Sequence, residues 1–226
     1  MSNTESTSLT DKILATLRES LHNTPPEQLI HVVLTGGSTG SALKDRLGEF
    51  AASIHAGIWE RVHLWWGDER FVPSDSSERN DFRIEETLGK YFSSDRVHRV
   101  IARDQCVDAQ TAADLYAVEL ERFGDPIPRF TCVMLGLGPD GHIASIFPNS
   151  DVISSSKVCS PVFLAPKPPP TRITMTLNTL NSSDLTLIFA AGPSKSSALS
   201  RLLAKDGTVQ SNPARGIRAN RIVIFD

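Results

Sequence analysis

The sequence predicts an α/β fold, a three-layer α/β/α sandwich built on a mostly parallel sheet. Two observations predict it. Short apolar runs alternate with longer stretches of helical periodicity, and glycines or polar residues follow directly after several of the apolar runs. Such alternation is typical of a parallel sheet with helices on both faces. No Pro-, Gly- or Ser-rich linker separates two apolar blocks, so we expect a single domain over residues 1–226.

The elements follow in order from their periodicity. In residues 11–22, Ile13, Leu14, Leu17 and Leu21 form one apolar stripe, which predicts the first helix. The same criterion predicts further helices over residues 41–52, 81–92, 109–123 and 194–204. Apolar runs bounded by turn residues predict strands over residues 31–34, 62–66, 97–102, 131–135, 158–164, 172–176, 185–190 and 221–225.

The stretch GLGPDGHIASIFP, residues 136–148, follows an apolar run and brings titratable side chains together. Its glycines, Gly138 among them, permit close approach by a ligand, and the turn presents Asp140 beside His142. Because histidine titrates near neutral pH, His142 is a candidate general acid or base. An isolated DGH sequence is equally compatible with an ordinary surface loop, so the hypothesis depends on other segments.

A second segment, HVVLTGGSTG, places Gly36, Gly37, Ser38 and Thr39 between a strand and a helix. Backbone N–H groups and hydroxyls at such a helix N-terminus can bind a phosphate or carboxylate. The Walker A and GxGxxG spacings are absent, which favours a sugar phosphate over a nucleotide. The alternative is a glycine turn in which Ser38 or Thr39 only caps the helix.

Charged residues follow directly after a third apolar run, at Asp68, Glu69 and Arg70. Since ligands bind at the carboxyl ends of strands in open α/β sheets, these residues point to the same crevice. The two acids could bind sugar hydroxyls, and Arg70 could hold an anion or stabilise an oxyanion. The alternative is a local surface ion pair.

Two cations and a histidine complete the set of candidates. Arg172 opens a strand after three prolines, and Lys195 lies in the first turn of a helix, against its dipole. A bound phosphate would explain Lys195, although a solvated lysine is the alternative. His63 alternates with apolar residues and is interpreted as a core or rim histidine. Asp140 and His142 lack a third ligand at a recognisable spacing, so no metal is expected.

The order of five blocks resembles that of the 6-phosphogluconolactonase family. These blocks are the turn at residues 36–39 and residues 67–80, 136–148, 168–181 and 190–199. The resemblance implies hydrolysis of 6-phospho-D-glucono-1,5-lactone to 6-phosphogluconate in the oxidative pentose phosphate pathway, without a cofactor. It also implies a Rossmann-like sheet, as in the glucosamine-6-phosphate deaminase fold.

The resemblance implies site roles as well. His142 is similar to the catalytic base that activates water, with Asp140 beside it and Arg70 lining the substrate pocket. Phosphate binding would fall to the turn at residues 36–39, Arg172 and Lys195. The other expected substrate contacts are Asp68, Glu69, Asn80 and Gly138. This chain departs from the family pattern at Ile143, Ile146 and Asn80, and none of these changes removes a titratable group.

Two other functions are weighed against lactone hydrolysis. Glucosamine-6-phosphate deaminases share the fold, but their histidine turn typically reads DGHIAFNEP, whereas this chain continues with ASIFP and has no acid there. They also carry DEY where this chain has Asp68, Glu69 and Arg70. The missing acid matters because isomerisation of a sugar needs additional proton transfer. A non-catalytic sugar-phosphate sensor would need a DNA-binding module, for which the thirty residues before His31 leave little room beside the first helix.

The composition of the chain excludes some classes of binding partner. The formal net charge is −3, with no basic face for a nucleic acid. No run approaches the roughly twenty apolar residues of a membrane span. Residues 1–8 lack the features of a signal peptide, so we expect a cytoplasmic protein, a monomer or small homo-oligomer, whose partner is the small-molecule lactone. Cys106, Cys132 and Cys159 form no CxxC motif and are expected to be reduced and mostly buried.

Overall fold

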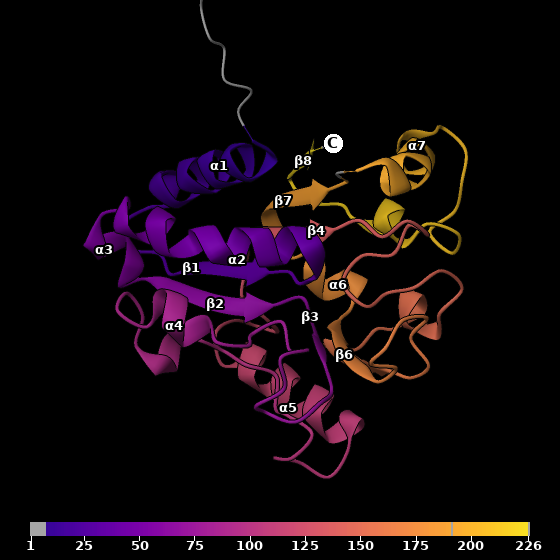
Figure 1. Cartoon of the computed structure of the whole chain (residues 1–226), viewed down its shortest axis with the longest axis horizontal. Coiled ribbons are helices and arrows are strands. Elements are labelled where there is room, and N and C mark those ends of the chain that lie inside the picture. The colour runs from indigo at the N-terminus through magenta and orange to yellow at the C-terminus, as the bar shows by residue number, and fades with distance from the viewer. Residues whose placement is uncertain (1–7, 191, 226) are drawn as a thin grey trace, which may run out of the picture.

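Five parallel strands form the central sheet of this computed structural model, which describes residues 8–190 and 192–225. Residues 1–7, Ala191 and Asp226 lie outside the described residues, and with them most of the polar N-terminal stretch. The strand order is β2–β1–β4–β7–β8. The strands are β1 (Ile30–Leu34), β2 (Val62–Trp66), β4 (Phe130–Gly136), β7 (Ser183–Phe189) and β8 (Arg221–Phe225). All four pairings are parallel (Figure 1).

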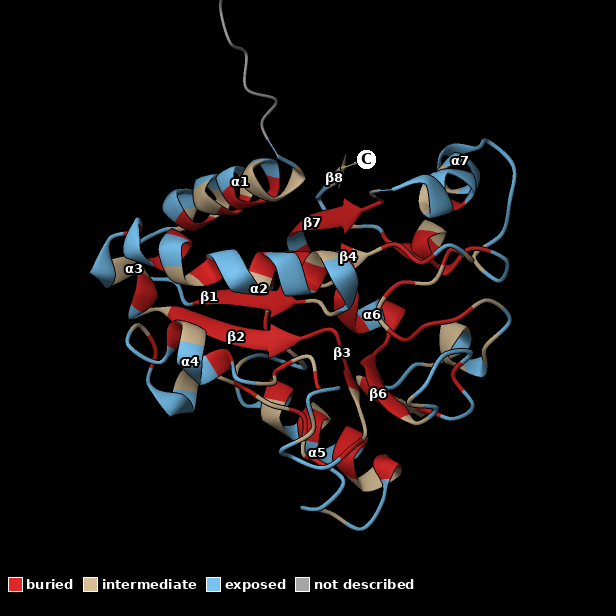
Figure 2. Cartoon of the chain, viewed as in Figure 1, coloured by how far each residue is buried: buried red, intermediate tan, exposed pale blue. Residues whose placement is uncertain are grey.

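Helices cover one face of this sheet. They are α1 (Leu9–Asn23), α2 (Gly37–Ala52), the short α3 (Ala56–Trp59) and α4 (Ile84–Leu88). Ser8 caps α1 by accepting the Asp11 N–H at 3.2 Å. Because the side chains of a strand alternate, Val32, Leu64 and Cys132 pack toward these helices. The strands β1 and β2 are buried along their whole length, whereas the outer faces of α1 and α2 are exposed (Figure 2).

The other face packs against α5 (Ala109–Glu121) and a second, smaller sheet. This antiparallel sheet has the order β3–β6–β5. Its strands are β3 (Asp68–Arg70), β6 (Arg172–Met175) and β5 (Cys159–Val162), and α6 (Leu177–Leu180) and α7 (Ser196–Leu203) pack nearby. The predicted α/β sandwich with a mostly parallel sheet is confirmed, with a small sheet sharing the second outer layer.

Several predicted elements are wrong in extent or pairing. Residues 97–102 form only one bridge, from Val97 to Leu64, instead of a strand. The helix expected over residues 81–92 shortens to α4 because Arg83, just before it, takes a left-handed conformation with φ 55°. The strands expected over residues 158–164 and 172–176 pair antiparallel with each other. Pro161 fits there because β5 is an edge strand.

The predictions for single histidine and cysteine residues agree with the structure. His63 is buried in the core, as predicted. Cys132 and Cys159 are buried and Cys106 is partly buried, and all three are free thiols. Among the described residues, no helix combines the length and the apolar character that crossing a bilayer requires.

Candidate active site

The N-terminus of α2 supplies an open set of backbone donors where β1 ends. The N-cap residue is Gly36, no side chain caps the helix, and its first turn contains no acid. The helix begins at Gly37, so Ser38 and Thr39 lie inside the first turn, and the alternative that one of them is the cap is wrong. A Cβ on Gly36 would stand 1.9 Å from Asn80 Oδ1, which explains the glycine. This helix end can therefore receive an anion.

His142 and Asp140 form a hydrogen-bonded pair in the turn after β4. The Nδ1 of His142 lies 2.5 Å from Asp140 Oδ1, and the same oxygen accepts the His142 backbone N–H at 3.2 Å. The imidazole lies against Gly138, where a Cβ would stand 2.1 Å from Nδ1, and packs on Phe147 with ring centroids 4.7 Å apart. Burial opposes ionisation of Asp140, but the hydrogen bonds and charge of His142 lower its pKa. An ionised Asp140 accepts from Nδ1 and leaves Nε2 of a neutral imidazole unprotonated.

Asp68 lies at the start of β3, where Ser145 holds its carboxylate and Asn80 holds its backbone carbonyl. The Ser145 hydroxyl donates to Oδ2 at 2.5 Å, and Asn80 Nδ2 donates to the Asp68 backbone carbonyl at 2.7 Å. Ser145 is fully buried. Since Asn80 Nδ2 faces these acceptors, its Oδ1 is set on the opposite side, buried and without a hydrogen-bond partner among the described residues. Asp68 and Asn80 thus reach the cavity in defined orientations.

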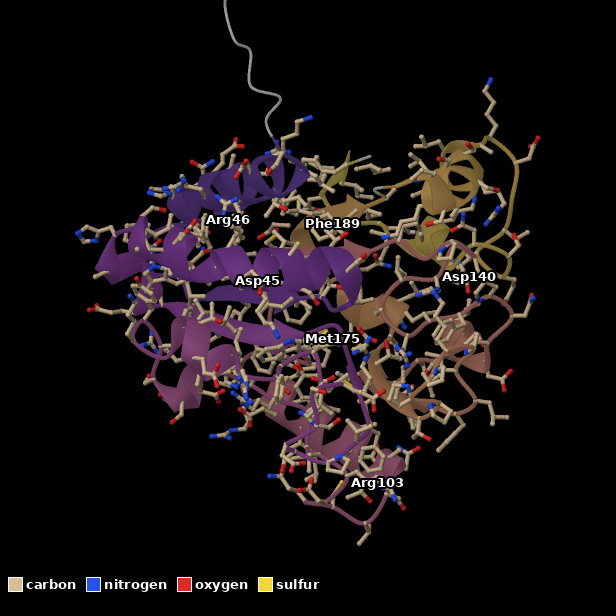
Figure 3. All side chains as sticks on the ribbon, in the orientation of Figure 1. Asp45, Arg46, Arg103, Asp140, Met175 and Phe189 are labelled. Carbon is tan, nitrogen blue, oxygen red and sulfur yellow. The ribbon has the colours of Figure 1, made fainter. Side chains whose placement is uncertain are left out.

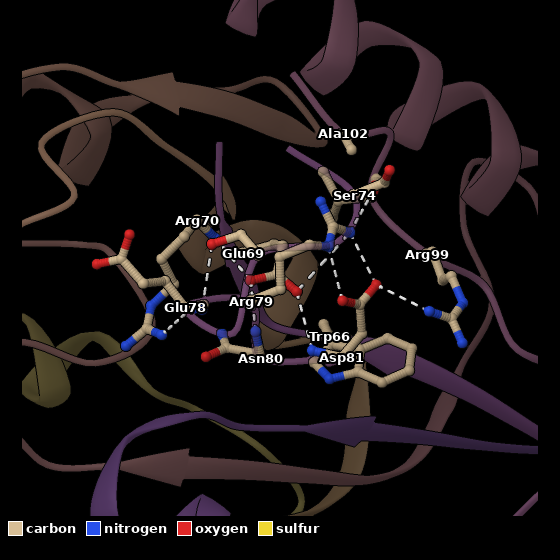
Figure 4. A network of polar contacts seen from close by, with 12 residues as sticks. Trp66, Glu69, Arg70, Ser74, Glu78, Arg79, Asn80, Asp81, Arg99 and Ala102 are labelled. Atoms are coloured by element: carbon tan, nitrogen blue, oxygen red, sulfur yellow. Dashed lines mark hydrogen bonds and ion pairs between the residues drawn. The ribbon is translucent and has the colours of Figure 1, made fainter. Parts of the chain in front are cut away.

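Glu69, in contrast, points away from the cavity into a buried network (Figure 4). Its carboxylate accepts the backbone N–H groups of Arg70, Asn80 and Asp81 at 2.7, 2.7 and 3.1 Å. Arg79 forms a two-bond ion pair with Asp81 in the same network, each bond 2.7 Å long. Burial and the charge of Asp81 raise the pKa of Glu69. The prediction that Glu69 binds sugar hydroxyls is corrected, because only 1% of this residue is exposed and its oxygens already have partners.

Four cationic side chains line the same cavity. Arg70 donates from Nη1 to the Glu78 carbonyl at 2.5 Å, and its Nε is buried without a partner among the described residues. Burial, followed by the positive charge of Lys167, lowers the pKa of Lys195. The Nη1 of Arg172 lies 3.9 Å from Asp68 Oδ2. With Asp68 as the acid lining the cavity, positive charge exceeds negative charge, and an anionic ligand would be attracted.

The cavity measures about 180 Å³ and brings together most of the predicted residues. Figure 3 shows Asp140 at the carboxyl edge of the sheet, far from Arg46 on α2. Asp140 does not line the cavity itself and reaches it through His142. The predicted residues that line it are Gly36, Gly37, Ser38, Thr39, Asp68, Arg70, Asn80, Gly138, His142, Arg172 and Lys195.

Sequence reasoning missed three polar residues at this site. Thr35 and Lys167 line the cavity, and Ser145 holds Asp68 from behind. Lys167 lies directly before the three prolines, and that cation beside a rigid segment was a usable signal. Ser145 carried no such signal, because its contact with Asp68 joins residues 77 positions apart.

Comparison with known proteins gives the family of this chain. A family model described as glucosamine-6-phosphate isomerases/6-phosphogluconolactonase matches residues 3–224. The chain belongs to this family. Within the glucosamine-6-phosphate isomerase/6-phosphogluconolactonase family, the 6-phosphogluconolactonase of Mycobacterium tuberculosis is 38% identical over 205 residues, covering 86% of this chain and 81% of that protein. The human 6-phosphogluconolactonase is 34% identical over 183 residues, covering 75% and 67%.

Solved structures of the family share the fold. The crystal structure of 6-phosphogluconolactonase from Thermotoga maritima superposes with a TM-score of 0.82 at 28% identity, covering 96% of this chain and 94% of that one. A monomeric glucosamine-6-phosphate deaminase reaches a TM-score of 0.76 at 17% identity, covering 96% and 92%. At that identity the deaminase shows only that the two proteins have the same fold.

Proposed function

We propose that the protein hydrolyses 6-phospho-D-glucono-1,5-lactone to 6-phosphogluconate, as an enzyme of the oxidative pentose phosphate pathway. The observation that carries this proposal is the His142–Asp140 pair beside a cavity walled by cations and an open helix N-terminus. Relatives 34–38% identical to this chain bear the name 6-phosphogluconolactonase, which supports the same reaction. A phosphorylated lactone offers both an ester carbonyl and an anion to such a site.

His142 acts as the base in this proposal. Asp140 accepts from Nδ1 and keeps the proton on that nitrogen, so Nε2 can take a proton from a water molecule as it attacks C1 of the lactone. Asp140 then stabilises the imidazolium that forms. The ring oxygen leaves as an alkoxide, and the imidazolium returns the proton to it. Ser145 is not the nucleophile in this proposal, because it is buried and donates to Asp68, and water attacks the carbonyl directly.

Arg70 is proposed to stabilise the tetrahedral oxyanion, alone or with backbone N–H groups of the cavity wall. Arg70 lines the cavity, and its Nη2 makes no hydrogen bond among the described residues and is not buried, so it has a donor to offer. Removing one such donor costs about 2.7 to 4 kcal/mol of transition-state stabilisation in other enzymes. The carboxylate of Asp68 is the acceptor for sugar hydroxyls, and Asn80, which lines the cavity and donates to the Asp68 carbonyl, positions it.

The phosphate is proposed to bind at the N-terminus of α2 together with Lys195. Residues 36–39 give uncapped N–H groups and the hydroxyls of Ser38 and Thr39, and Lys195 adds positive charge across the cavity. The cytoplasmic location, the single domain over residues 1–226, the absence of a nucleic-acid partner and the oligomeric state stay predictions from the sequence.

The test is hydrolysis of freshly generated 6-phosphogluconolactone, followed by proton release and corrected for the spontaneous reaction. We expect His142→Ala to lose about 10²- to 10⁴-fold in kcat/KM. His22→Ala, an exposed histidine on α1, is the matched control and should keep wild-type activity. Wild-type protein no faster than the background would refute the proposal, and ammonia released from glucosamine 6-phosphate would instead identify a deaminase.

A further inference from the structure

The guanidinium of Arg172 is bound mainly to one loop of its own chain. Nε donates to the Pro169 carbonyl at 3.2 Å, and Nη2 donates to the carbonyls of Lys167 at 3.0 Å and Pro168 at 3.5 Å. The residue is 7% exposed. Only Nη1 is left, and it lies 3.9 Å from Asp68 Oδ2. Most of the donors of this arginine are therefore occupied before any ligand binds.

The loop that receives these bonds has few backbone donors of its own. Residues 168–170 are three prolines, which have no N–H to donate. One backbone bond closes the loop, from the Ala165 N–H to the Pro170 carbonyl at 2.8 Å. The three carbonyls that precede Pro170 take their donors from Arg172. A planar fork of five N–H groups suits this task, and the single ammonium nitrogen of lysine does not.

The loop carries Lys167 to the cavity. Lys167 lines it together with Lys195, and the charge of Lys167 acts with burial to lower the pKa of Lys195, so the two ammonium groups lie near each other. Neither lysine forms an ion pair with a carboxylate within residues 8–190 and 192–225. Two neighbouring cations without a carboxylate repel each other, and a doubly charged phosphate between them would remove that repulsion.

We propose that Lys167 and Lys195 together bind the phosphate of the substrate, and that Arg172 is a positioning residue that holds Lys167 in place through the three loop carbonyls. The proposal rests on the lactonase function proposed above. It changes the role expected for Arg172 from a phosphate ligand to a support of the loop. It also assigns phosphate binding to Lys167, which the sequence had not singled out.

A double-mutant cycle tests this assignment, with 6-phosphogluconate as the probe. Its Kd is measured calorimetrically for wild type, Lys167→Ala, Arg172→Lys and the double variant, and KM and kcat for the lactone are measured alongside. We expect each single change to weaken binding by on the order of 10- to 100-fold, as for the loss of a charge-assisted bond. KM should rise while kcat changes little. The exposed Lys205→Ala is the matched control and should bind as wild type does.

The double variant decides between the two roles of Arg172. If Arg172 acts through Lys167, the double variant binds no worse than Lys167→Ala. If Arg172 contacts the phosphate itself, the two losses multiply, and Arg172→Lys alone keeps most of the affinity because it keeps the charge. Multiplying losses, or a retained affinity in Arg172→Lys, would overturn the positioning role.

The outcomes distinguish a folding defect from a loss of binding, and this inference from the lactonase function. Lys167 is exposed, so Lys167→Ala tests the site even if the buried Arg172 variant unfolds, and an unchanged KM in Lys167→Ala overturns the proposal alone. Active wild type with multiplying losses removes this inference but keeps the lactonase. If wild type binds 6-phosphogluconate and the losses do not multiply, but the lactone is not hydrolysed, the proposed phosphate site stands and the lactonase function is refuted. A wild type that neither binds nor turns over removes both.

Discussion

A single methyl group at Gly138 should inactivate the site without unfolding the protein. A Cβ built there would stand 2.1 Å from Nδ1 and 2.2 Å from Cε1 of His142, whereas ordinary contacts begin at 3.4 Å. The imidazole must therefore shift by about 1.3 Å, the difference between the contact and the clash. The 2.5 Å bond from Nδ1 to Asp140 cannot survive such a shift, and Nε2 leaves its position as well.

The expected loss follows from this displacement. A misplacement of about 1 Å of a reacting group costs roughly 10²-fold, which is about 2.7 kcal/mol of activation free energy. We therefore expect Gly138→Ala to lower kcat/KM for 6-phosphogluconolactone about 100-fold. The φ angle of Gly138 lies outside the left-handed region, so alanine is compatible with the backbone, and the free energy of unfolding should fall by only about 1 to 3 kcal/mol.

Gly48→Ala is the matched control, because Gly48 lies on α2 and does not line the cavity. Its Cβ would come no closer than 3.3 Å to the Thr87 carbonyl oxygen, so kcat/KM should stay within about a factor of two of wild type. Both variants are assayed by proton release, with their unfolding followed in urea. A folded Gly138→Ala enzyme that loses less than about tenfold would refute the reasoning that the position of His142 governs the reaction.

Two predictions concern stability. Arg79→Ala should lower the free energy of unfolding in urea by about 3 to 5 kcal/mol, because it leaves the buried charge of Asp81 without its main partner. Arg46→Ala, which removes exposed ion pairs, should cost under about 1 kcal/mol, and equal losses would contradict this account. Burial, then neighbouring charges, lowers the pKa of His31 to about 3 and of His63 to about 4. Below an unfolded-state pKa of 6.5 the unfolded chain takes up protons that the folded chain does not. Stability should thus fall as the pH falls from about 6.5 toward 4, by about 2 kcal/mol per histidine at pH 5. Urea unfolding at pH 7 and pH 5 measures this loss, and a stability independent of pH would exclude it.

Much of the fold could be predicted because its signals are local. The apolar run that became β2 was predicted with its full extent, and the stripe containing Leu17 predicted α1 to within two residues at each end. The antiparallel pairing of β5 with β6 could not be predicted from periodicity, because pairing joins residues distant in the chain. Residues 97–102 look like a strand locally but pair through a single bridge.

The candidate site also contains contacts that the sequence predicted and contacts that it did not. Asp140 and His142 are two positions apart, so one turn brings their side chains together and the sequence alone sufficed to pair them. Asp68 and Glu69 are adjacent and chemically alike, yet one faces the cavity and the other the buried network. The strand β3 that separates them was not predicted, and successive side chains of a strand point to opposite faces.

The sequence by itself determined which chemical groups the protein carries, where most strands of the central sheet and its longer helices lie along the chain, and the order of its five motif blocks. These properties depend on local periodicity and on the conformations that glycine and proline allow. Only the tertiary structure decided which of those groups are free to meet a ligand. The chain occupies most donors of Arg172 and the carboxylate oxygens of Glu69, whereas the Lys167 side chain lines the cavity. The hydrogen-bond partners of Arg172 and Glu69 lie within twelve positions along the chain, but packing across the fold decides that these two side chains are buried and must be satisfied by those partners.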